Sequence, residues 1–311
     1  MTARKFEFTI GENWDGKTVK SFLQYHEFSA ANITALKNNP KGIMLGRKRV
    51  TVLRQLHTGD ILTLRLRERP DREQTLVPVE IPLDVIYEDE DIIVVNKQAG
   101  LLTHPGPGQR ENSLGNALFY YWRLHNKMYG YHPVSRLDKD TTGLLVVAKN
   151  SYAAGKLGIQ IKNRAVDRWY LALAEGCLPD GGTVDAPILR APDSVIRRIA
   201  GTKAQETEQT RAVTHFSVVR SFPDRTLLLV KLETGRTHQI RVHMAHIGHP
   251  LCGDWLYGKE GHITNRPALH SYALRFTHPV TEETMFFSAP IPEDIARVVG
   301  STENLQIEVN I

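Results

Sequence analysis

The chain has few of the features that mark secreted, membrane or zinc-binding proteins. Its 311 residues include only two cysteines, Cys177 and Cys252, which lie far apart and form no Cys-x-x-Cys pair. They indicate neither a disulfide framework nor a zinc knuckle. The N-terminus has no apolar signal core, and no run approaches the roughly 18 apolar residues that a membrane span requires. We therefore expect a cytoplasmic protein without a membrane partner.

The chain also lacks the glycine-rich loops that hold nucleotides, because neither a Gly-x-Gly-x-x-Gly fingerprint nor a Gly-x-x-x-x-Gly-Lys loop is present. Four histidines lie close together in the sequence, at His238, His243, His246 and His249. On a helix His238 and His243 would diverge by about 140°, and the zinc-binding spacing His-x-x-x-His is absent. We expect neither a cofactor nor a metal ion. A metal-dependent hydrolase is the competing enzyme class, and tightly bound zinc after purification would indicate it.

Positive charge is concentrated in the first 67 residues. This segment has twelve Lys or Arg and five Asp or Glu, a net charge of +7, whereas the whole chain has +5 and the remainder therefore −2. A solvated surface normally mixes both signs, so this excess favours a polyanionic partner. Charge alone does not distinguish RNA from DNA or an anionic lipid surface.

The basic segment has the pattern of a small α+β unit. Apolar residues recur at helical intervals between Val19 and Leu36. Short strands are then predicted at 43–45, 50–53 and 61–66. A turn is expected at 58–60, and the basic triplet Arg47, Lys48 and Arg49 falls on the connection between the first two strands.

A polar stretch with three prolines follows the basic segment and opposes regular structure. It predicts a linker over residues 68–83. We therefore predict an N-terminal domain at 1–67, a larger domain at 84–298 and a C-terminal tail at 299–311. The hydrophobic content of 41% is sufficient for one large core and one small core.

A carboxylate on a Thr-Thr-Gly turn is the first candidate for catalysis. Asp138 lies in the peptide Ser-Arg-Leu-Asp-Lys-Asp-Thr-Thr-Gly, directly before the apolar run 144–148, which predicts a buried strand. A turn of this kind fixes one reactive group at the edge of a cleft. From this peptide alone, the simpler interpretation is a turn in which Asp138 or Asp140 caps backbone donors and pairs with Lys139 or Arg136.

A second peptide, Thr-Gly-Arg-Thr-His-Gln-Ile-Arg-Val-His at 234–243, favours the catalytic interpretation. Thr237 is placed to cap a helix. The apolar residues on one face of that helix are Ile240, Met244 and Ile247. Arg241 follows His238 by three residues on another flank, so it can direct a rigid guanidinium at a carboxylate. Taken alone, the pattern would describe an ordinary amphipathic helix with a solvated arginine.

These two peptides resemble the signatures of the RluA-type RNA pseudouridine synthases, of the RluC/RluD-like kind. Two further peptides agree, Tyr-Glu-Asp-Glu-Asp-Ile-Ile-Val-Val-Asn-Lys at 87–97 and Arg-Trp-Tyr-Leu-Ala at 168–172, and Gly253-Asp254 also fits. The four motifs occur in order over roughly residues 80 to 295. Ser135 replaces the family's usual His and Gln98 its frequent Pro. These departures concern the choice of substrate rather than the class of reaction.

The resemblance implies an α+β fold in which one large mixed or antiparallel sheet carries the catalytic cleft across its middle. The strands that the sequence pattern predicts for this sheet are 91–96, 144–149, 169–174 and 226–232. The N-terminal segment resembles a diverged S4-type RNA-binding module, chiefly through Arg49-Val50-Thr51 and Gly59-Asp60-Ile61-Leu62. An α+β cap with a basic surface is the alternative.

The reaction that the resemblance implies is the isomerisation of uridine within RNA, which needs no cofactor. Asp138 would be the catalytic aspartate, acting either as a nucleophile or as a general base. Arg241 would be its ion-pair partner and would favour the ionised carboxylate. Tyr170 would stack on the target base, with an ordinary strand aromatic as the structural alternative.

The resemblance and the charge pattern also imply a set of RNA contacts. Arg136 would fill the stack vacated by a flipped-out uracil or contact a phosphate, and Lys97 would contact a phosphate or close a turn. The other predicted RNA-binding residues are Arg47, Lys48, Arg49, Arg236 and His238.

We expect an isomerase that acts as a monomer on large-subunit ribosomal RNA, with transfer RNA as the alternative substrate. A catalytically silent RNA-binding protein on the same scaffold is disfavoured, because Asp138, Tyr170 and Arg241 are all present.

Overall fold

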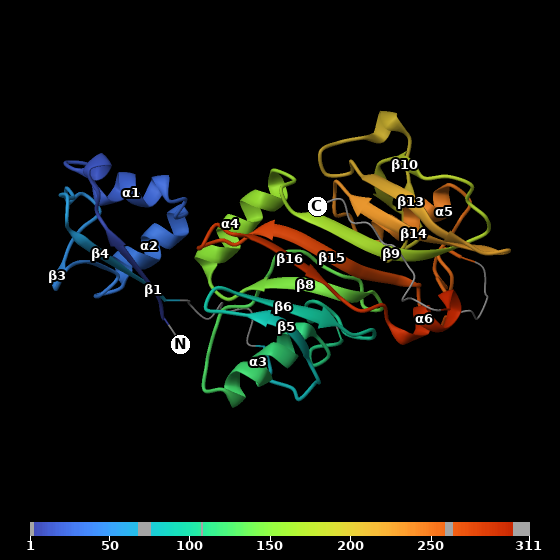
Figure 1. Ribbon diagram of the computed structural model, residues 1–311, viewed down its shortest axis with the longest axis horizontal. Coiled ribbons are helices and arrows are strands. Elements are labelled where there is room, and N and C mark those ends of the chain that lie inside the picture. Colours follow the sequence, from blue (N-terminus) through green and yellow to red (C-terminus); the bar gives the residue numbers. More distant parts are fainter. Residues whose placement is uncertain (1–2, 68–75, 107, 259–263, 301–311) are drawn as a thin grey trace.

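The computed structural model describes residues 3–67, 76–106, 108–258 and 264–300. Figure 1 shows a small N-terminal unit at one end of the molecule and a long, twisted sheet with its covering helices in the rest. Among the described residues, no helix is both long enough and apolar enough to cross a membrane. The predicted C-terminal tail, apart from its first two residues, lies outside the described residues.

The helices of the described chain are α1 (Val19–Tyr25), α2 (Ala30–Asn38), α3 (Leu114–Leu124), α4 (Ser151–Lys162), α5 (Gln239–His246) and α6 (Glu293–Val299). The strands are β1 (Ala3–Thr9), β2 (Ile43–Leu45), β3 (Lys48–Arg49), β4 (Ile61–Arg67), β5 (Asp84–Glu88), β6 (Ile92–Lys97), β7 (His132–Pro133), β8 (Thr142–Ala148), β9 (Asp167–Glu175), β10 (Gly182–Asp185), β11 (Ile188–Arg190), β12 (Arg198–Ala200), β13 (Val213–Ser221), β14 (Arg225–Leu232), β15 (Leu269–Thr277) and β16 (Thr284–Ser288).

Residues 3–67, here called the N-terminal module, form a four-stranded sheet in the order β1-β4-β2-β3 beside α1 and α2. Thr18 caps α1, and Ser29 caps α2 in a capping box with Asn32, because these side chains satisfy backbone N–H groups that the first helical turn leaves unpaired. The strands expected at 43–45 and 61–66 are confirmed as β2 and β4.

One predicted strand of the N-terminal module is wrong. Residues 50–53 do not form a strand, and the chain pairs through Lys48 and Arg49 instead, so these two basic residues lie in β3 and not in a connection. The short β2–β3 pair turns at Gly46, whose positive φ suits a tight hairpin. The β-branched residues that follow β3 form their backbone hydrogen bonds with neighbours in α1 and β2 instead. The Lys20 N–H, for example, donates to the Val52 carbonyl.

The main sheet has the strand order β10-β13-β14-β9-β15-β8-β6-β5, with β16 paired to β15 and β7 paired to β8. Neighbours within it are antiparallel except for β15 and β8, which run parallel. The predicted mixed sheet is therefore confirmed, as are strands close to all four predicted ranges. In Figure 1, α3 lies beneath β5 and β6, whereas α4 lies near the end of β15 that faces the N-terminal module.

β8 is the strand that the apolar run after Asp138 predicted. Every residue of β8 is buried, because the sheet is covered on both faces at this point. Gly143, near its start, has a φ of +108°, and a Cβ there would lie 2.3 Å from the Ser271 carbonyl oxygen of β15. The Thr-Thr-Gly sequence thus allows the close parallel pairing of β8 with β15, which fixes the turn that carries Asp138.

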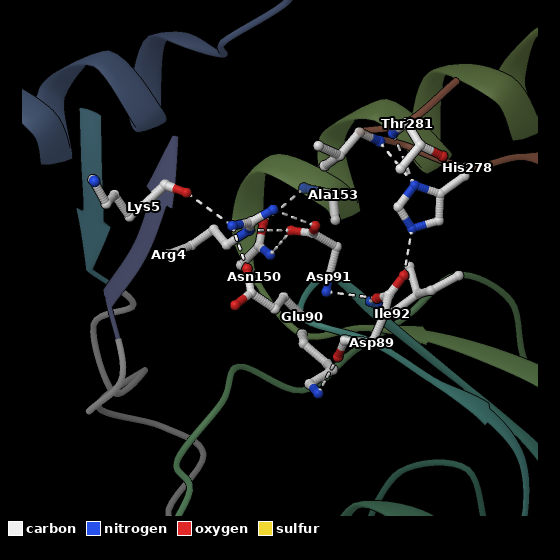
Figure 2. Close-up of polar contacts among 12 residues, drawn as sticks. Arg4, Lys5, Asp89, Glu90, Asp91, Ile92, Asn150, Ala153, His278 and Thr281 are labelled. Carbon is white, nitrogen blue, oxygen red and sulfur yellow. Dashed lines mark hydrogen bonds and ion pairs between the residues drawn. The ribbon is translucent and has the colours of Figure 1, made fainter. Parts of the chain in front are cut away.

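The N-terminal module is bound to the main sheet by a polar junction. Arg4 of β1 donates two hydrogen bonds of 2.8 Å to the two carboxylate oxygens of Asp91, and Asn150 donates to the same carboxylate at 2.8 Å (Figure 2). Next to them, Asp89 accepts from the Asp91 and Ile92 N–H groups. The side chain of Tyr152, at the start of α4, belongs to the hydrophobic core of the N-terminal module, so apolar packing reinforces the ionic contact.

The described part of the predicted linker is attached to the main sheet's domain. Leu76 is buried in the large core, and the Asn116 side chain of α3 donates to the Val77 carbonyl. Residues 76–83 therefore pack against α3. Residues 68–75 of the predicted linker lie outside the described residues.

Candidate active site

A pocket of about 710 Å³ opens beside the Asp138 turn. This volume is in the range of small-molecule and substrate sites, which is about 300 to 1,000 Å³. Its walls come from the peptide before β8, the end of α4, the start of β9, the end of β14 and the start of α5. Segments that are far apart in the sequence therefore converge on one carboxylate.

The pocket is cationic. Its acidic lining residues are Asp138, Glu208 and Glu233, whereas its basic lining residues are Arg136, Lys162, Arg164, Arg168, Arg211 and Arg236. Six cations against three carboxylates attract an anionic ligand and raise its local concentration.

The turn that carries Asp138 is held by three buried side chains. Lys97 donates to the Lys139 carbonyl at 3.0 Å, Arg266 donates to the Asp140 carbonyl at 3.1 Å, and Thr103 donates to the Leu137 carbonyl at 2.9 Å. Lys97 ends β6, Thr103 follows it by six residues, and Arg266 precedes β15. These bonds hold the backbone of the turn rigid. The Asp138 side chain is about a quarter exposed, so its carboxylate oxygens face the pocket.

Lys97 does not lie where RNA reaches it, which corrects the predicted phosphate contact. Its side chain is 2% exposed, and its ammonium also donates to the Gln98 and Leu101 carbonyls, both at 2.9 Å. Burial lowers the pKa of Lys97 to about 7, while three carbonyl acceptors are the partners that a charged ammonium needs. The turn-closing alternative is the one that the structure supports.

Arg241 of α5 reaches Asp138, but its main partner is Asp254. Its Nε and Nη2 donate to the two oxygens of Asp254 at 2.7 and 2.8 Å, whereas its Nη1 lies 3.4 Å from Asp138 Oδ2. Asp254 is fully buried. Burial alone would lower the pKa of Arg241, but the Asp254 carboxylate raises it above its ordinary value, so the guanidinium stays charged. Asp254 is part of the Gly253-Asp254 motif in the sequence, and no pattern there predicts this role.

His238 lies beside Arg241 and not on the outside of the helix. It is the N-cap of α5 and has a left-handed φ of +59°, so the predicted cap at Thr237 is wrong by one residue. Its Nδ1 is 2.8 Å from the Tyr257 hydroxyl, and its Nε2 is 3.9 Å from Asp138 Oδ2. Burial lowers the pKa of His238, which favours the neutral imidazole.

Tyr257 contacts both groups that face Asp138. Its oxygen accepts from the Arg198 N–H at 2.9 Å, which leaves its own proton for His238 Nδ1. The proton of the neutral His238 ring is therefore assigned to Nε2, on the side of Asp138. The ring of Tyr257 also lies 5.1 Å from the Arg241 guanidinium. No sequence pattern identified Tyr257, because its role depends on three elements that meet only in the fold.

The other predicted pocket residues occupy distinct places. Tyr170 of β9 is 5% exposed and lines the pocket with Asp138, and burial raises the pKa of its phenol. Arg136 is exposed in the pocket wall. Arg236 also lines it, and its guanidinium donates to the Arg211 and Glu208 carbonyls at 2.9 and 2.6 Å. The predicted triplet 47–49 is exposed on the N-terminal module and does not line this pocket.

The four clustered histidines are dispersed by the fold. His243 is buried between the Thr214 hydroxyl and the Ala186 carbonyl, and His249 contacts the Glu175 carbonyl at 2.8 Å. In the described ranges, the side chains placed closely enough to hold a metal ion are Asp89, Asp91 and His278 at the domain junction. Asp91 is occupied by Arg4 and Asn150, and His278 Nε2 contacts Asp89 at 2.8 Å (Figure 2), so this group fits an ion-pair network.

Comparisons with known proteins agree on one family. The family description "RNA pseudouridylate synthase" matches residues 91–246. An uncharacterized RNA pseudouridine synthase, YjbO of Bacillus subtilis, is 40% identical over 283 residues, which cover 91% of this chain and 98% of the relative. The ribosomal large subunit pseudouridine synthase D of Escherichia coli K12 is 42% identical over 243 residues, which cover 74% and 73%.

The chain belongs to the RNA pseudouridylate synthase family.

A solved structure agrees with this assignment. The human RNA pseudouridylate synthase domain containing 1 matches with a TM-score of 0.55 at 29% identity, over 67% of this chain and 83% of that one. The synthase is therefore an isomerase that acts on RNA, which confirms the predicted reaction class. The matched residues 91–246 include Asp138, Tyr170 and Arg241. Asp254 and Tyr257, which orient Arg241 and His238, follow the matched segment.

Proposed function

We propose that this synthase converts uridine to pseudouridine in large-subunit ribosomal RNA and that Asp138 is its catalytic carboxylate. The observation that carries the proposal is the position of Asp138, on a rigid turn in a cationic pocket with Arg241 and Tyr170 beside it. The ribosomal substrate is supported by the relatives named ribosomal large subunit pseudouridine synthase D, at 37% to 42% identity.

The reaction rearranges bonds without net gain or loss of atoms. The N1–C1′ bond of the nucleotide breaks, the uracil turns, and a C5–C1′ bond forms. C5 then loses its proton and N1 gains one. Asp138 either attacks as a nucleophile, which bonds it transiently to the ribose or to the base, or removes a ribose proton as a general base. In both roles the carboxylate acts as an anion, and Arg241 Nη1 lies 3.4 Å from Asp138 Oδ2.

The remaining pocket groups have roles in presenting the base. A uracil inside a folded RNA must leave its stack before a carboxylate reaches its glycosidic bond. We assign the exposed Arg136 to the vacated stack and the Tyr170 ring to one face of the flipped uracil. We assign the N-terminal module, with Arg47, Lys48 and Arg49 exposed, to sequence-independent contacts with RNA phosphates.

The test is release of tritium from RNA labelled at uracil C5, since this proton is lost only when C5 becomes bonded to ribose. Ribosomal RNA from cells that lack the gene is incubated with the wild-type enzyme or with Asp138→Asn. We expect release by the wild-type enzyme and a loss of at least about a thousandfold for Asp138→Asn, because a residue that acts only in the transition state contributes several kcal/mol.

Asp140→Asn is the matched control. Asp140 lies in the same turn but does not line the pocket, so its variant should retain most of the activity. Equal activity of Asp138→Asn and the wild-type enzyme would disprove the role of Asp138. Release from transfer RNA alone would disprove the ribosomal substrate while leaving the isomerase intact.

A further inference from the structure

Arg168 is a buried cation that the pocket leaves without an acidic partner. It belongs to β9, two residues before Tyr170, so both side chains project from the same face of the strand. Both line the pocket beside Asp138. Trp169 projects to the other face, where Lys231 and Arg275 lie over its ring.

The hydrogen bonding of Arg168 is incomplete. The residue is 8% exposed, and its Nε has no hydrogen-bond partner among the residues that the structure describes. Its Nη2 donates to the Thr234 carbonyl at 3.4 Å, which is long for an N–H donor. A guanidinium has five N–H donors, and burying them unpaired is costly.

The acidic groups next to Arg168 are bound to other cations. Asp167 contacts Arg275 at 2.5 Å and Lys231 at 2.8 Å. Glu233 contacts Arg164 and His215, both at 2.9 Å. Within the described part of the chain, no carboxylate lies in ion-pair contact with Arg168. Because a buried charge is normally paired, an anion from outside the protein is the missing partner.

The local backbone is shaped around this guanidinium. A Cβ at Gly235 would lie 2.9 Å from Arg168 Nη1, so the absence of a side chain there allows the guanidinium to lie against the turn between β14 and α5. The same turn carries Arg236 into the pocket. The pocket wall next to Tyr170 is thus formed by a cation and a glycine turn that accommodates it.

We propose that Arg168 binds a backbone phosphate of the RNA, at the nucleotide whose base lies against Tyr170. This inference rests on the proposed function. A phosphodiester supplies the anion that the buried guanidinium lacks, and arginine binds phosphate oxygens through two parallel N–H donors. The phosphate would hold the ribose of the flipped nucleotide in place next to Asp138.

The test measures RNA affinity against salt for Arg168→Gln and Arg168→Lys. Both are made in the Asp138→Asn background, which we expect to bind RNA without converting it, and the probe is the ribosomal RNA transcript that releases tritium with the wild-type enzyme. We expect Arg168→Gln to weaken binding about tenfold and to reduce the slope of log K against log salt by about one, because one phosphate contact is lost. Arg168→Lys should retain the slope but not the full affinity, since the lysine ammonium keeps the charge but lacks the two parallel N–H donors of the guanidinium.

Two controls separate this contact from other roles. Arg225→Gln removes the arginine at the start of β14, which pairs with Asp224 and lies opposite Glu175 at the far end of β9 from Arg168, and it should not change the affinity. Gly235→Ala should weaken binding in the wild-type pocket and have little further effect once Arg168 is Gln, because the added methyl acts by displacing the guanidinium.

Thermal unfolding without RNA supplies an independent readout. A neutral Gln needs no counter-ion, so Arg168→Gln should unfold at the same temperature as the wild-type protein or higher. A midpoint several degrees lower would show that the guanidinium is structural and would overturn the proposal. An unchanged salt slope in the Asp138→Asn background, with slower tritium release when Arg168→Gln is made in the enzyme that keeps Asp138, would overturn it too, since Arg168 would then act on the base. Absence of tritium release by the wild-type enzyme would instead reject the proposed function.

Discussion

Asp254 is the residue that gives Arg241 its orientation. It holds Nε and Nη2 in a fork, so Nη1 is the donor left for Asp138. The arrangement explains why the contact with the catalytic candidate is long, at 3.4 Å. A guanidinium bound twice by a buried carboxylate stays in place while the ligand of the pocket changes, and the site keeps its geometry.

Tyr257 orients the second group that faces Asp138, and its hydroxyl is testable. Tyr257→Phe removes the donor to His238 Nδ1 but keeps the ring that contacts Arg241. We expect the maximal rate of tritium release to fall about five- to tenfold, since one positioning hydrogen bond is worth about 1 kcal/mol. RNA affinity should be unchanged.

The control is Tyr25→Phe, which removes an exposed hydroxyl on α1 and should leave the rate as it is. Nitrogen NMR of labelled histidine reports the tautomer directly, with the His238 proton expected on Nε2 in the wild-type protein. A Tyr257→Phe variant that loses RNA affinity at an unchanged rate would mean that Tyr257 contacts RNA instead.

At the scale of elements, sequence patterns were sufficient to place a helix or strand wherever its hydrophobic periodicity agrees with its burial. β8 was predicted because an apolar run bounded by Thr-Thr-Gly is typical of a buried strand, and the run is buried at every position. The face of α5 was also predicted, with Ile240 and Met244 in the core. Its start was misplaced, since His238 takes a left-handed conformation that propensity alone does not favour.

The pairing of distant elements was beyond sequence reasoning. β1 was not predicted, although it pairs along its full length with β4. The three donors that hold the Asp138 turn come from 97, 103 and 266, and no spacing relates them to each other. Lys97 was predicted to contact a phosphate or to close a turn, and its burial favours the turn.

The burial of His270, where β15 pairs with β8, makes the free energy of unfolding depend on pH. His270 of β15 lies opposite Thr142 of β8, and burial lowers its pKa from 6.5 to about 4. The folded state therefore excludes a proton that the unfolded chain binds. The contribution of His270 to the free energy of unfolding is fully present above pH 6.5 and is lost as the pH falls from 6.5 toward 4.

Substituting His270 removes this titration. Between pH 7.5 and pH 5.0 the wild-type protein should lose about 2 kcal/mol of unfolding free energy through His270. The total loss of His270→Gln over the same range should be smaller than that of the wild-type protein by this amount. Denaturant unfolding at the two pH values measures the difference. His125→Gln, at an exposed site on the end of α3, should behave like the wild-type protein. Equal losses for all three proteins would contradict the burial of a neutral His270.

At the scale of the whole molecule, the N-terminal module is packed against the main sheet's domain. Arg4 pairs with Asp91, and Lys156 of α4 pairs with Glu27 at 2.5 Å. The Tyr152 ring lies 4.3 Å from Phe28 and 4.9 Å from Phe6. The basic surface at 47–49 is thereby held in a fixed relation to the pocket, so one RNA can contact both at defined spacing.

Tyr152→Ala tests this fixed placement. Removing a buried aromatic ring from a core costs about 3 kcal/mol, and here the lost contacts join two units. We expect the N-terminal module to separate from the rest, which small-angle X-ray scattering would record as a larger radius of gyration. Tyr25→Ala removes an exposed ring from the same module and should not change the radius. An unchanged radius for Tyr152→Ala would mean that the polar junction alone holds the module.

The most direct test of the account is to map pseudouridine in ribosomal RNA from three strains. One lacks the gene, one is complemented with the wild-type gene, and one carries Asp138→Asn. We predict large-subunit positions that carry pseudouridine only with the wild-type gene. The same positions modified in all three strains would contradict the proposed substrate, and positions restored by Asp138→Asn would contradict the catalytic role of Asp138.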